Sequence, residues 1–245
     1  MPALHNAVCS EIIKFRRNKM AWMGTLIIVT IPLFMIWNCL IIDPEKEYME
    51  WLMSLLMLNT LVLPIVNGFV ITSSMQREYQ DRTIRNILTA SVSRGKFLTA
   101  KLVVWFLWYL ISFCLFEVIA IAGCYALFPI EFTTGNMGYA LFLFTQSNFF
   151  SFIAGIPILL ICVKQQALFY PSMLATLGSA VLQAAGLQVS EELILPACVC
   201  PWTAVSISGI AGFGTYYYWI CFVSIFLCGL AGFMGVIISF KNQDQ

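Results

Sequence analysis

The chain has 245 residues, of which 60% are hydrophobic and only 10% are charged, and its formal net charge is +1. A soluble domain carries about 25% charged residues, so this chain has too few to cover a surface that faces water. We therefore expect the lipid bilayer to surround it, and the net charge gives no indication of a nucleic-acid partner.

The first patterned segment is 3–19, where apolar residues alternate with Glu11 and with a basic cluster that ends at Lys19. This pattern is typical of a short amphipathic helix at the cytoplasmic membrane interface, and a disordered basic tail is the alternative. The apolar run that follows, 21–42, is longer than the roughly 7–15 residues of a secretory signal. We therefore expect a retained membrane anchor.

Further apolar runs follow along the chain. A membrane-spanning helix needs about 20 mostly apolar residues, and six segments meet this condition. They are 21–42, 51–74, 102–128, 139–163, 167–187 and 216–240. No room remains between them for a soluble domain, so we expect an all-α integral membrane protein with six transmembrane helices, in which 1–245 form a single domain.

The basic residues indicate the orientation of these spans. When the six spans cross the membrane in alternating directions, 12 of the 13 Lys and Arg residues fall on one side, together with both termini. Only Lys46 falls on the other side. Because basic residues gather in cytoplasmic loops, we expect both termini, and the segment between the second and third spans, to be cytoplasmic.

Residues 188–215 are too apolar for an ordinary exposed loop, and prolines and glycines interrupt them. Non-helical backbone at membrane depth must be shielded by protein. We therefore expect a re-entrant or outer-leaflet hairpin between the fifth and sixth spans.

Prolines and glycines also lie within the predicted spans. Prolines interrupt the backbone hydrogen bonds of a helix and act there as hinges or as static kinks. Glycines spaced by three residues on the last span permit close approach of another helix, either within the subunit or between subunits. The residues are Pro32, Pro64, Pro157, Pro171, Gly229, Gly232 and Gly235.

Five residues form a candidate intramembrane polar site: Asn59, Asn67, Glu117, Gln146 and Asn148. A carboxylate at mid-bilayer costs about 2.5–3.5 kcal/mol. Glu117 is therefore a candidate site for a proton, a cation or a cationic substrate. The alternatives are a protonated residue hydrogen-bonded to a neighbouring helix and a residue near the outer end of a tilted helix. The amides are expected to bond across helices.

No catalytic motif is present. The string at Gly95-Lys96 lacks the Ser or Thr and the earlier Gly of a phosphate-binding loop. With His5 as its single histidine and no G-x-S-x-G turn, the chain offers no catalytic residues and no metal site. The nine cysteines read as packing residues. We expect neither an enzyme nor a cofactor bound by this chain.

The region 76–97 gathers charge between two apolar flanks. It contains two acid–base pairs with the i, i+4 spacing favoured on a helix and an apolar strip at i, i+3, i+4. Bases alone would retain the loop in the cytoplasm, and that role requires neither the acids nor the strip. We therefore predict a short cytoplasmic helix that docks on a partner through Glu78, Asp81, Arg82, Ile84, Arg85, Ile87 and Leu88.

The order of elements and this region resemble the permease subunits of ABC-2 type exporters. In that family the loop after the second span reads Glu, Gly-Thr or Arg-Thr, Leu-Leu-Thr, Ser-Arg and a Lys-rich helix start. The usual Gly is Arg82 here, a departure from the pattern. The corresponding residues are Glu78, Arg82-Thr83, Ile87-Leu88-Thr89, Ser93-Arg94 and Lys96.

This resemblance implies two cytoplasmic ABC ATPase subunits, which bind ATP and Mg, and a second permease subunit that is identical or homologous. The docking residues of 76–97 would then transmit closure of the ATPase to the spans. The small size and Pro201-Trp202 resemble permeases that protect bacteria from lantibiotics. This finer likeness implies the bacterial cell membrane and a peptide substrate.

Acidic residues dominate the loops on the opposite side of the membrane. Glu45, Glu47, Glu191 and Glu192 are candidate contacts for a cationic peptide, which they would attract electrostatically. The alternatives are another ABC-2 cargo, such as a drug, an ion-coupled solute or a lipid-linked glycan, and a membrane sensor or scaffold that transports nothing.

Overall fold

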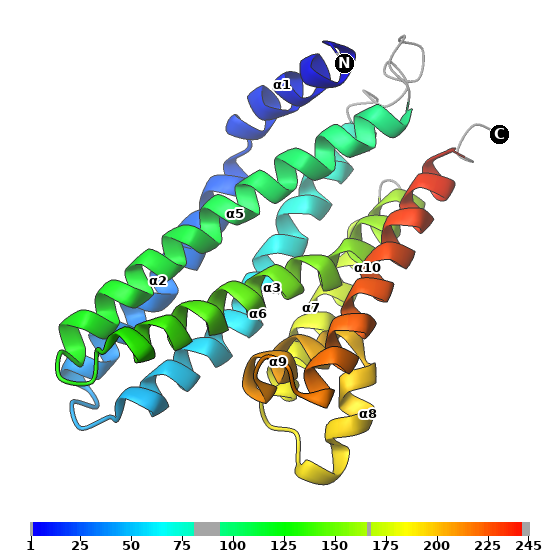
Figure 1. Ribbon diagram of the computed structural model, residues 1–245. Coiled ribbons are helices and arrows are strands. Elements are labelled where there is room, and N and C mark those ends of the chain that lie inside the picture. Colours follow the sequence, from blue (N-terminus) through cyan, green and yellow to red (C-terminus); the bar gives the residue numbers. More distant parts are fainter. Residues whose placement is uncertain (1, 81–93, 166–167, 242–245) are drawn as a thin grey trace.

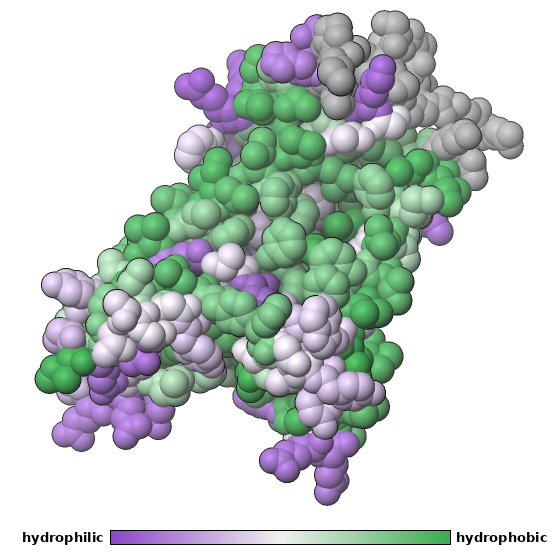
Figure 2. Space-filling view, in the orientation of Figure 1, coloured by the Kyte–Doolittle hydropathy of each residue, from purple (hydrophilic) through white to green (hydrophobic). Residues whose placement is uncertain are grey.

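A computed structural model describes residues 2–80, 94–165 and 168–241. Within this part the chain consists of helices and short connections, without a strand. Figure 1 shows the long helices side by side in an elongated bundle, with both chain termini at the same end. Figure 2 shows an apolar surface between two hydrophilic ends, as expected of a protein that spans a bilayer.

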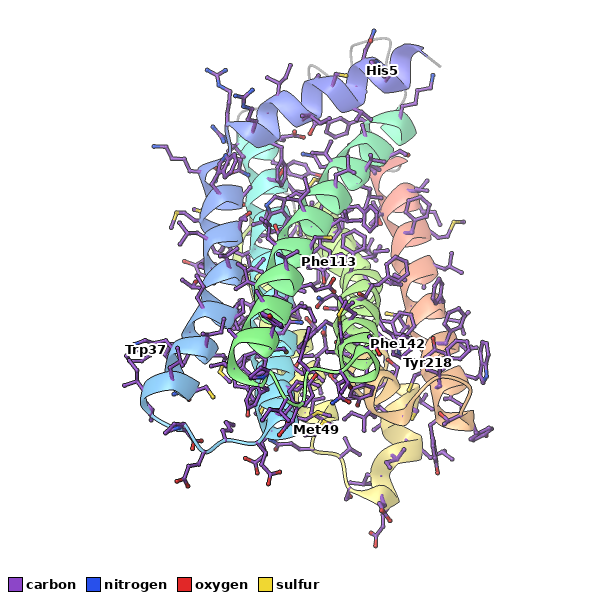
Figure 3. The ribbon with its side chains drawn as sticks, turned by 60° about the vertical axis from the view of Figure 1, so that its left-hand side comes forward. His5, Trp37, Met49, Phe113, Phe142 and Tyr218 are labelled. Atoms are coloured by element: carbon purple, nitrogen blue, oxygen red, sulfur yellow. The ribbon has the colours of Figure 1, made fainter. Side chains whose placement is uncertain are left out.

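The chain begins with α1 (Pro2–Arg16) and continues after a short break into α2 (Lys19–Ile41). Asn18 caps α2, because its side-chain oxygen accepts a hydrogen bond from the backbone N–H of Met20 at 3.1 Å. Figure 3 shows α1 lying across the end of the bundle, steeply inclined to the long helices. A helix therefore forms over most of 3–19, in the orientation that an interfacial helix requires.

Five described helices are long and apolar enough to cross a membrane. The remaining predicted span, 167–187, corresponds to α7, which has only 17 residues and is not among the five. The prediction of six spans is therefore confirmed only for the other five. These are α2, α3 (Tyr48–Gln80), α5 (Arg94–Leu127), α6 (Thr134–Gln165) and α10 (Tyr216–Lys241), and α7 is Tyr170–Gly186.

Helices α3 and α6 form the centre of the bundle. In their most apolar stretches 67% and 72% of the residues are buried, against 33% for α2 and 28% for α10. The largest fully buried side chains include Trp51 of α3, Trp105 of α5 and Phe144 of α6. Lipid is as apolar as this core, so close packing rather than transfer from water holds the helices together.

Residues 188–215 fold back on the bundle as short helices at the end opposite the termini (Figure 1). They are η1 (Glu191–Leu193), α8 (Ile194–Val199) and α9 (Pro201–Ala211). The indole N–H of Trp202 donates to the carbonyl oxygen of Ala154 at 3.1 Å, which fixes α9 against α6. The region is therefore helical, and a re-entrant or outer-leaflet hairpin stays a prediction.

The four prolines expected within the spans divide into two groups. Pro32, Pro64 and Pro157 lie inside α2, α3 and α6, as expected. Pro171 lies instead in the first turn of α7, where a backbone N–H has no partner within the helix and none is lost. The expectation that Pro171 interrupts a helix is therefore wrong.

The three spaced glycines of α10 face α6 within the same subunit. A Cβ atom at Gly229 would meet Ile153, and one at Gly235 would meet Leu160. A Cβ atom at Gly232 would lie 2.8 Å from the backbone nitrogen of Pro157. The glycines therefore form a packing seam between α6 and α10, and the alternative of a seam between subunits does not apply to these faces.

We predict that Gly232→Ala lowers the free energy of unfolding by about 1–3 kcal/mol, because the added methyl group meets backbone that cannot turn aside. The matched control is Gly178→Ala in α7, where an added Cβ has no neighbour within 4 Å and alanine is the better helix former. Thermal unfolding of both variants in nanodiscs tests this. Equal melting temperatures would contradict the seam.

Candidate functional site

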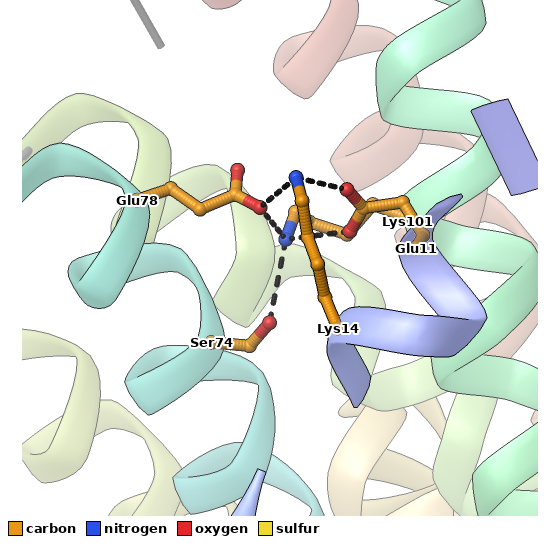
Figure 4. Close-up of polar contacts among 5 residues, drawn as sticks. All are labelled: Glu11, Lys14, Ser74, Glu78 and Lys101. Atoms are coloured by element: carbon orange, nitrogen blue, oxygen red, sulfur yellow. Dashed lines mark hydrogen bonds and ion pairs between the residues drawn. The ribbon is translucent and has the colours of Figure 1, made fainter. Parts of the chain in front are cut away.

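Four charged side chains from three helices meet at the end of the bundle that carries the termini (Figure 4). We call this group the ion cluster: Glu11 and Lys14 of α1, Glu78 of α3 and Lys101 of α5. The Lys101 Nζ atom lies 2.9 Å from Glu78 Oε1 and 3.3 Å from Glu11 Oε2. The Lys14 Nζ atom lies 2.7 Å from Glu11 Oε1 and 3.5 Å from Glu78 Oε1. Each lysine therefore bridges both carboxylates.

The ion cluster is buried except for Lys14. Glu11, Glu78 and Lys101 are 6%, 7% and 3% exposed. Lys101 also donates a hydrogen bond to Ser74 Oγ at 3.3 Å, so three oxygen atoms surround its ammonium group. Burying a charge is costly unless it is paired and hydrogen-bonded, and the balance of two acids with two bases meets that condition.

The secondary structure explains how these residues meet. Glu11 and Lys14 are spaced i, i+3 on one face of α1. Glu78 lies in the last turn of α3, and Lys101 lies near the start of α5. The Phe15 and Trp108 rings, whose centroids are 6.0 Å apart, hold α1 against α5. The ion cluster thus joins α1 to both helices that flank residues 81–93.

The pKa values of the two α1 residues reflect this pairing. Burial alone would raise the pKa of Glu11, but the charge of Lys101 and the hydrogen bond from Lys14 lower it below its ordinary value of 4.5. Burial alone would lower the pKa of Lys14, but Glu11 and Glu78 raise it above its ordinary value of 10.5. Their contribution to stability is therefore fully present between these values, and is lost in stronger acid or base.

Among the predicted ATPase-coupling residues, only Glu78 belongs to the described part of the chain. It lies buried in the ion cluster, not on an exposed face. The other residues of this set, Asp81, Arg82, Ile84, Arg85, Ile87 and Leu88, lie outside the described residues. The ion cluster was not predicted from the sequence. The signal that could have indicated it is Lys101, a base at the edge of an apolar run, because a base buried there needs an acidic partner.

The intramembrane polar site is partly assembled. The side-chain amide of Asn59 in α3 donates a hydrogen bond to Asn148 Oδ1 of α6 at 2.6 Å. This confirms that polar amides of the spans bond to each other across helices. The hydroxyl of Tyr109 in α5 donates to the backbone oxygen of Asn148 at 2.8 Å, and Glu117 lies close to the side chains of Thr145 and Asn148. We call Asn59, Glu117 and Asn148 the polar layer.

Two predicted members of this site lie apart from those contacts. Asn67 is farther along α3, where it faces Gly155 of α6. Gln146 is 8% exposed, and neither polar atom of its amide has a hydrogen-bond partner within the described ranges. Three of the five predicted polar residues therefore lie together around α6, and Asn67 and Gln146 do not belong to that group.

The predicted outer acids are all exposed at the end opposite the termini. Glu45 and Glu47 lie in the connection between α2 and α3, and Glu191 and Glu192 lie in η1. Figure 2 shows hydrophilic surface at two separate places at this end. The acids thus form two groups rather than one patch.

Comparison with models of protein families identifies one family. Residues 7–181 match the model described as ABC-2 family transporter protein. The matched stretch begins in α1 and ends within α7, so it contains the whole ion cluster and the polar layer. A comparison with curated proteins found no match.

We predict that Lys101→Met lowers the free energy of unfolding by about 3–5 kcal/mol, because Glu11 and Glu78 remain buried and lose the buried base that pairs with both of them. Thermal unfolding in nanodiscs measures the effect. Lys96→Met is the control, since Lys96 is an exposed base on the same helix. Adding Glu78→Gln to Lys101→Met should restore part of the lost stability, and failure of either comparison would contradict the ion cluster.

Proposed function

The chain belongs to the ABC-2 transporter family, and on this premise we propose that it is the permease subunit of an ATP-driven exporter of antimicrobial peptides. A member of this family is a multi-pass membrane protein that associates with ABC ATPase subunits. ATP and Mg would bind those partner subunits, and this chain would supply the pathway. We place the exporter in the bacterial cell membrane, with both termini in the cytoplasm.

The ion cluster is the observation that supports coupling to an ATPase. It joins α1, the end of α3 and the start of α5, and these two helix ends belong to the region 76–97 that is predicted to dock on the ATPase. Separating buried ion pairs costs about 3–5 kcal/mol. A force that moves one of these three helix ends is therefore expected to move the other two with it. Movement of 76–97 would thus reach two spans and the interfacial helix.

The exporter that we propose contains two ABC ATPase subunits and a second permease subunit, identical or homologous to this chain. The exposed sides of α2 and α10 are available for contact with a second membrane subunit. Large apolar residues on both helices, such as Leu26, Trp37, Leu227 and Met234, are exposed. Such faces pack against lipid or against another subunit.

The outer acids support a cationic peptide as cargo. Glu45 and Glu47 on one side and Glu191 and Glu192 on the other create negative potential at the end that would face outward. A cationic peptide at the outer membrane surface would gather there before it is expelled. The separation of the two groups fits an extended cargo better than a small ion.

We predict that Ile87→Asp combined with Leu88→Asp abolishes stimulated ATP hydrolysis and export by the complex reconstituted in liposomes. The charged residues would remove the apolar strip predicted to contact the ATPase, and membrane insertion should be unchanged. Ile130→Asp is the control, because Ile130 is 92% exposed at the opposite end. If the purified protein carries no ABC ATPase partner, or the double variant transports normally, this mechanism is wrong.

We predict that replacing Glu45, Glu47, Glu191 and Glu192 by Gln raises the sensitivity of cells to a cationic lantibiotic severalfold at low salt, and less at high salt, because screening shortens the reach of these charges. Tolerance is measured against a panel that includes neutral drugs. Unchanged tolerance of the variant at low salt would remove the electrostatic argument. Protection by the wild type only against neutral compounds would identify a different cargo.

A further inference from the structure

A pocket of about 310 Å³ lies where α1 ends and α2 begins, against the last turns of α3. A second pocket of about 410 Å³ next to the ion cluster shares Arg17, Asn18 and Arg77 with it. We call the first one the arginine pocket. Its lining residues are Arg17, Asn18, Lys19, Met20, Ser73 and Arg77.

The bases of the arginine pocket differ from those of the ion cluster. Lys14 and Lys101 are ion-paired, whereas Arg17, Lys19 and Arg77 have no carboxylate within ion-pairing distance in the part of the chain that the structure describes. No acidic residue lines this pocket. Three like charges around one pocket repel each other and create a positive potential, which an anion would relieve.

Asn18 adds an uncharged donor to the same pocket. Its side chain is almost fully buried, with the residue 8% exposed. The Oδ1 atom accepts from Met20, and no described acceptor lies within hydrogen-bonding distance of the Nδ2 atom. The amino end of α2, which carries partial positive charge, begins at the next residue. Arginine, lysine and amide donors therefore converge with a helix amino end.

The surface of α2 that leads from the pocket into the apolar part of the helix is suited to lipid chains. Met20, Met23 and Ile27 are spaced i, i+3, i+7 on α2 and are 41%, 59% and 45% exposed. Trp22, also exposed, donates from its indole N–H to the backbone oxygen of Arg16 at 2.9 Å, an arrangement typical of the membrane–water boundary. The pocket thus lies at the level where polar headgroups meet hydrocarbon.

We propose that the arginine pocket binds the phosphate group of an anionic phospholipid. Arg17 and Arg77 supply the planar donor pairs that match phosphate oxygens, and Lys19 and the Asn18 amide complete the site. The acyl chains then lie along Met20, Met23 and Ile27. A lipid held there joins the α1–α2 junction to the end of α3, directly beside the ion cluster.

The test measures lipid retention. Protein is purified from nanodiscs that contain equal amounts of phosphatidylglycerol and phosphatidylcholine, and the lipids still bound are counted by native mass spectrometry. The wild type should retain phosphatidylglycerol preferentially. Arg17→Gln with Arg77→Gln should reduce that retention about tenfold, since each base near the headgroups contributes to anionic-lipid binding.

Lys96→Gln with Lys164→Gln is the matched control, because it removes two exposed bases at the same end of the bundle. Its lipid retention should equal that of the wild type. Equal loss in the control would assign the effect to overall charge and overturn the proposal. Unchanged retention by the arginine variant would do the same.

A third arm separates the lipid from a free anion. In phosphatidylcholine nanodiscs, millimolar inorganic phosphate or glycerol phosphate should neither bind detectably nor protect the wild type against thermal unfolding. Protection by the free anion that depends on Arg17 and Arg77 would show a site for a soluble ligand and overturn the lipid assignment. If the double variant does not fold, the single variants Arg17→Gln and Arg77→Gln should each lower retention severalfold.

Discussion

The burial of Lys101 between two carboxylates constrains the whole end of the molecule that carries the termini. Lys101 is only 3% exposed, and such a buried charge is tolerated only where its acceptors are fixed in place. Glu78 must therefore reach Lys101 from α3, and Glu11 must reach it from α1. This requirement holds α1 across the bundle and joins it to the end of α3 and the start of α5, both of which extend into the region 76–97.

Hydrophobic runs predicted the apolar part of each long helix but not its full length. The second predicted span ends at residue 74, whereas α3 continues to Gln80, and the third predicted span, from 102, is the later part of α5, which begins at Arg94. Hydropathy reports only the part of a helix that lipid surrounds. The extensions are polar and are held by tertiary ion pairs, which no sequence window contains. The packing seam was visible as glycine spacing, but its partner, α6, lies far away in the chain.

The candidate site was predictable residue by residue but not as an arrangement. Glu117 and the amides were recognisable because polar residues are rare in apolar runs, yet their grouping around Asn148 depends on how α3, α5 and α6 pack. Glu78 shows the opposite limit. Its spacing predicts a local pair with Arg82, which lies outside the described residues, and the fold also brings it to Lys101 and Lys14. Local spacing cannot reveal such a partner.

The seam between α6 and α10 also has a consequence for how this protein can vary. Pro157 has no N–H to donate, so it leaves the carbonyl of Ile153 without its usual helical bond, and that carbonyl oxygen lies against Gly229. The turn of α6 over residues 153–157 and the bare surface of α10 therefore pack as a single steric unit. The contacts at Gly229 are with Ile153, and those at Gly232 include the backbone of residue 157, so replacing Pro157 alone would release neither glycine. The distance between the backbones of α6 and α10, and not the identity of residue 157, therefore limits which residues these two positions accept.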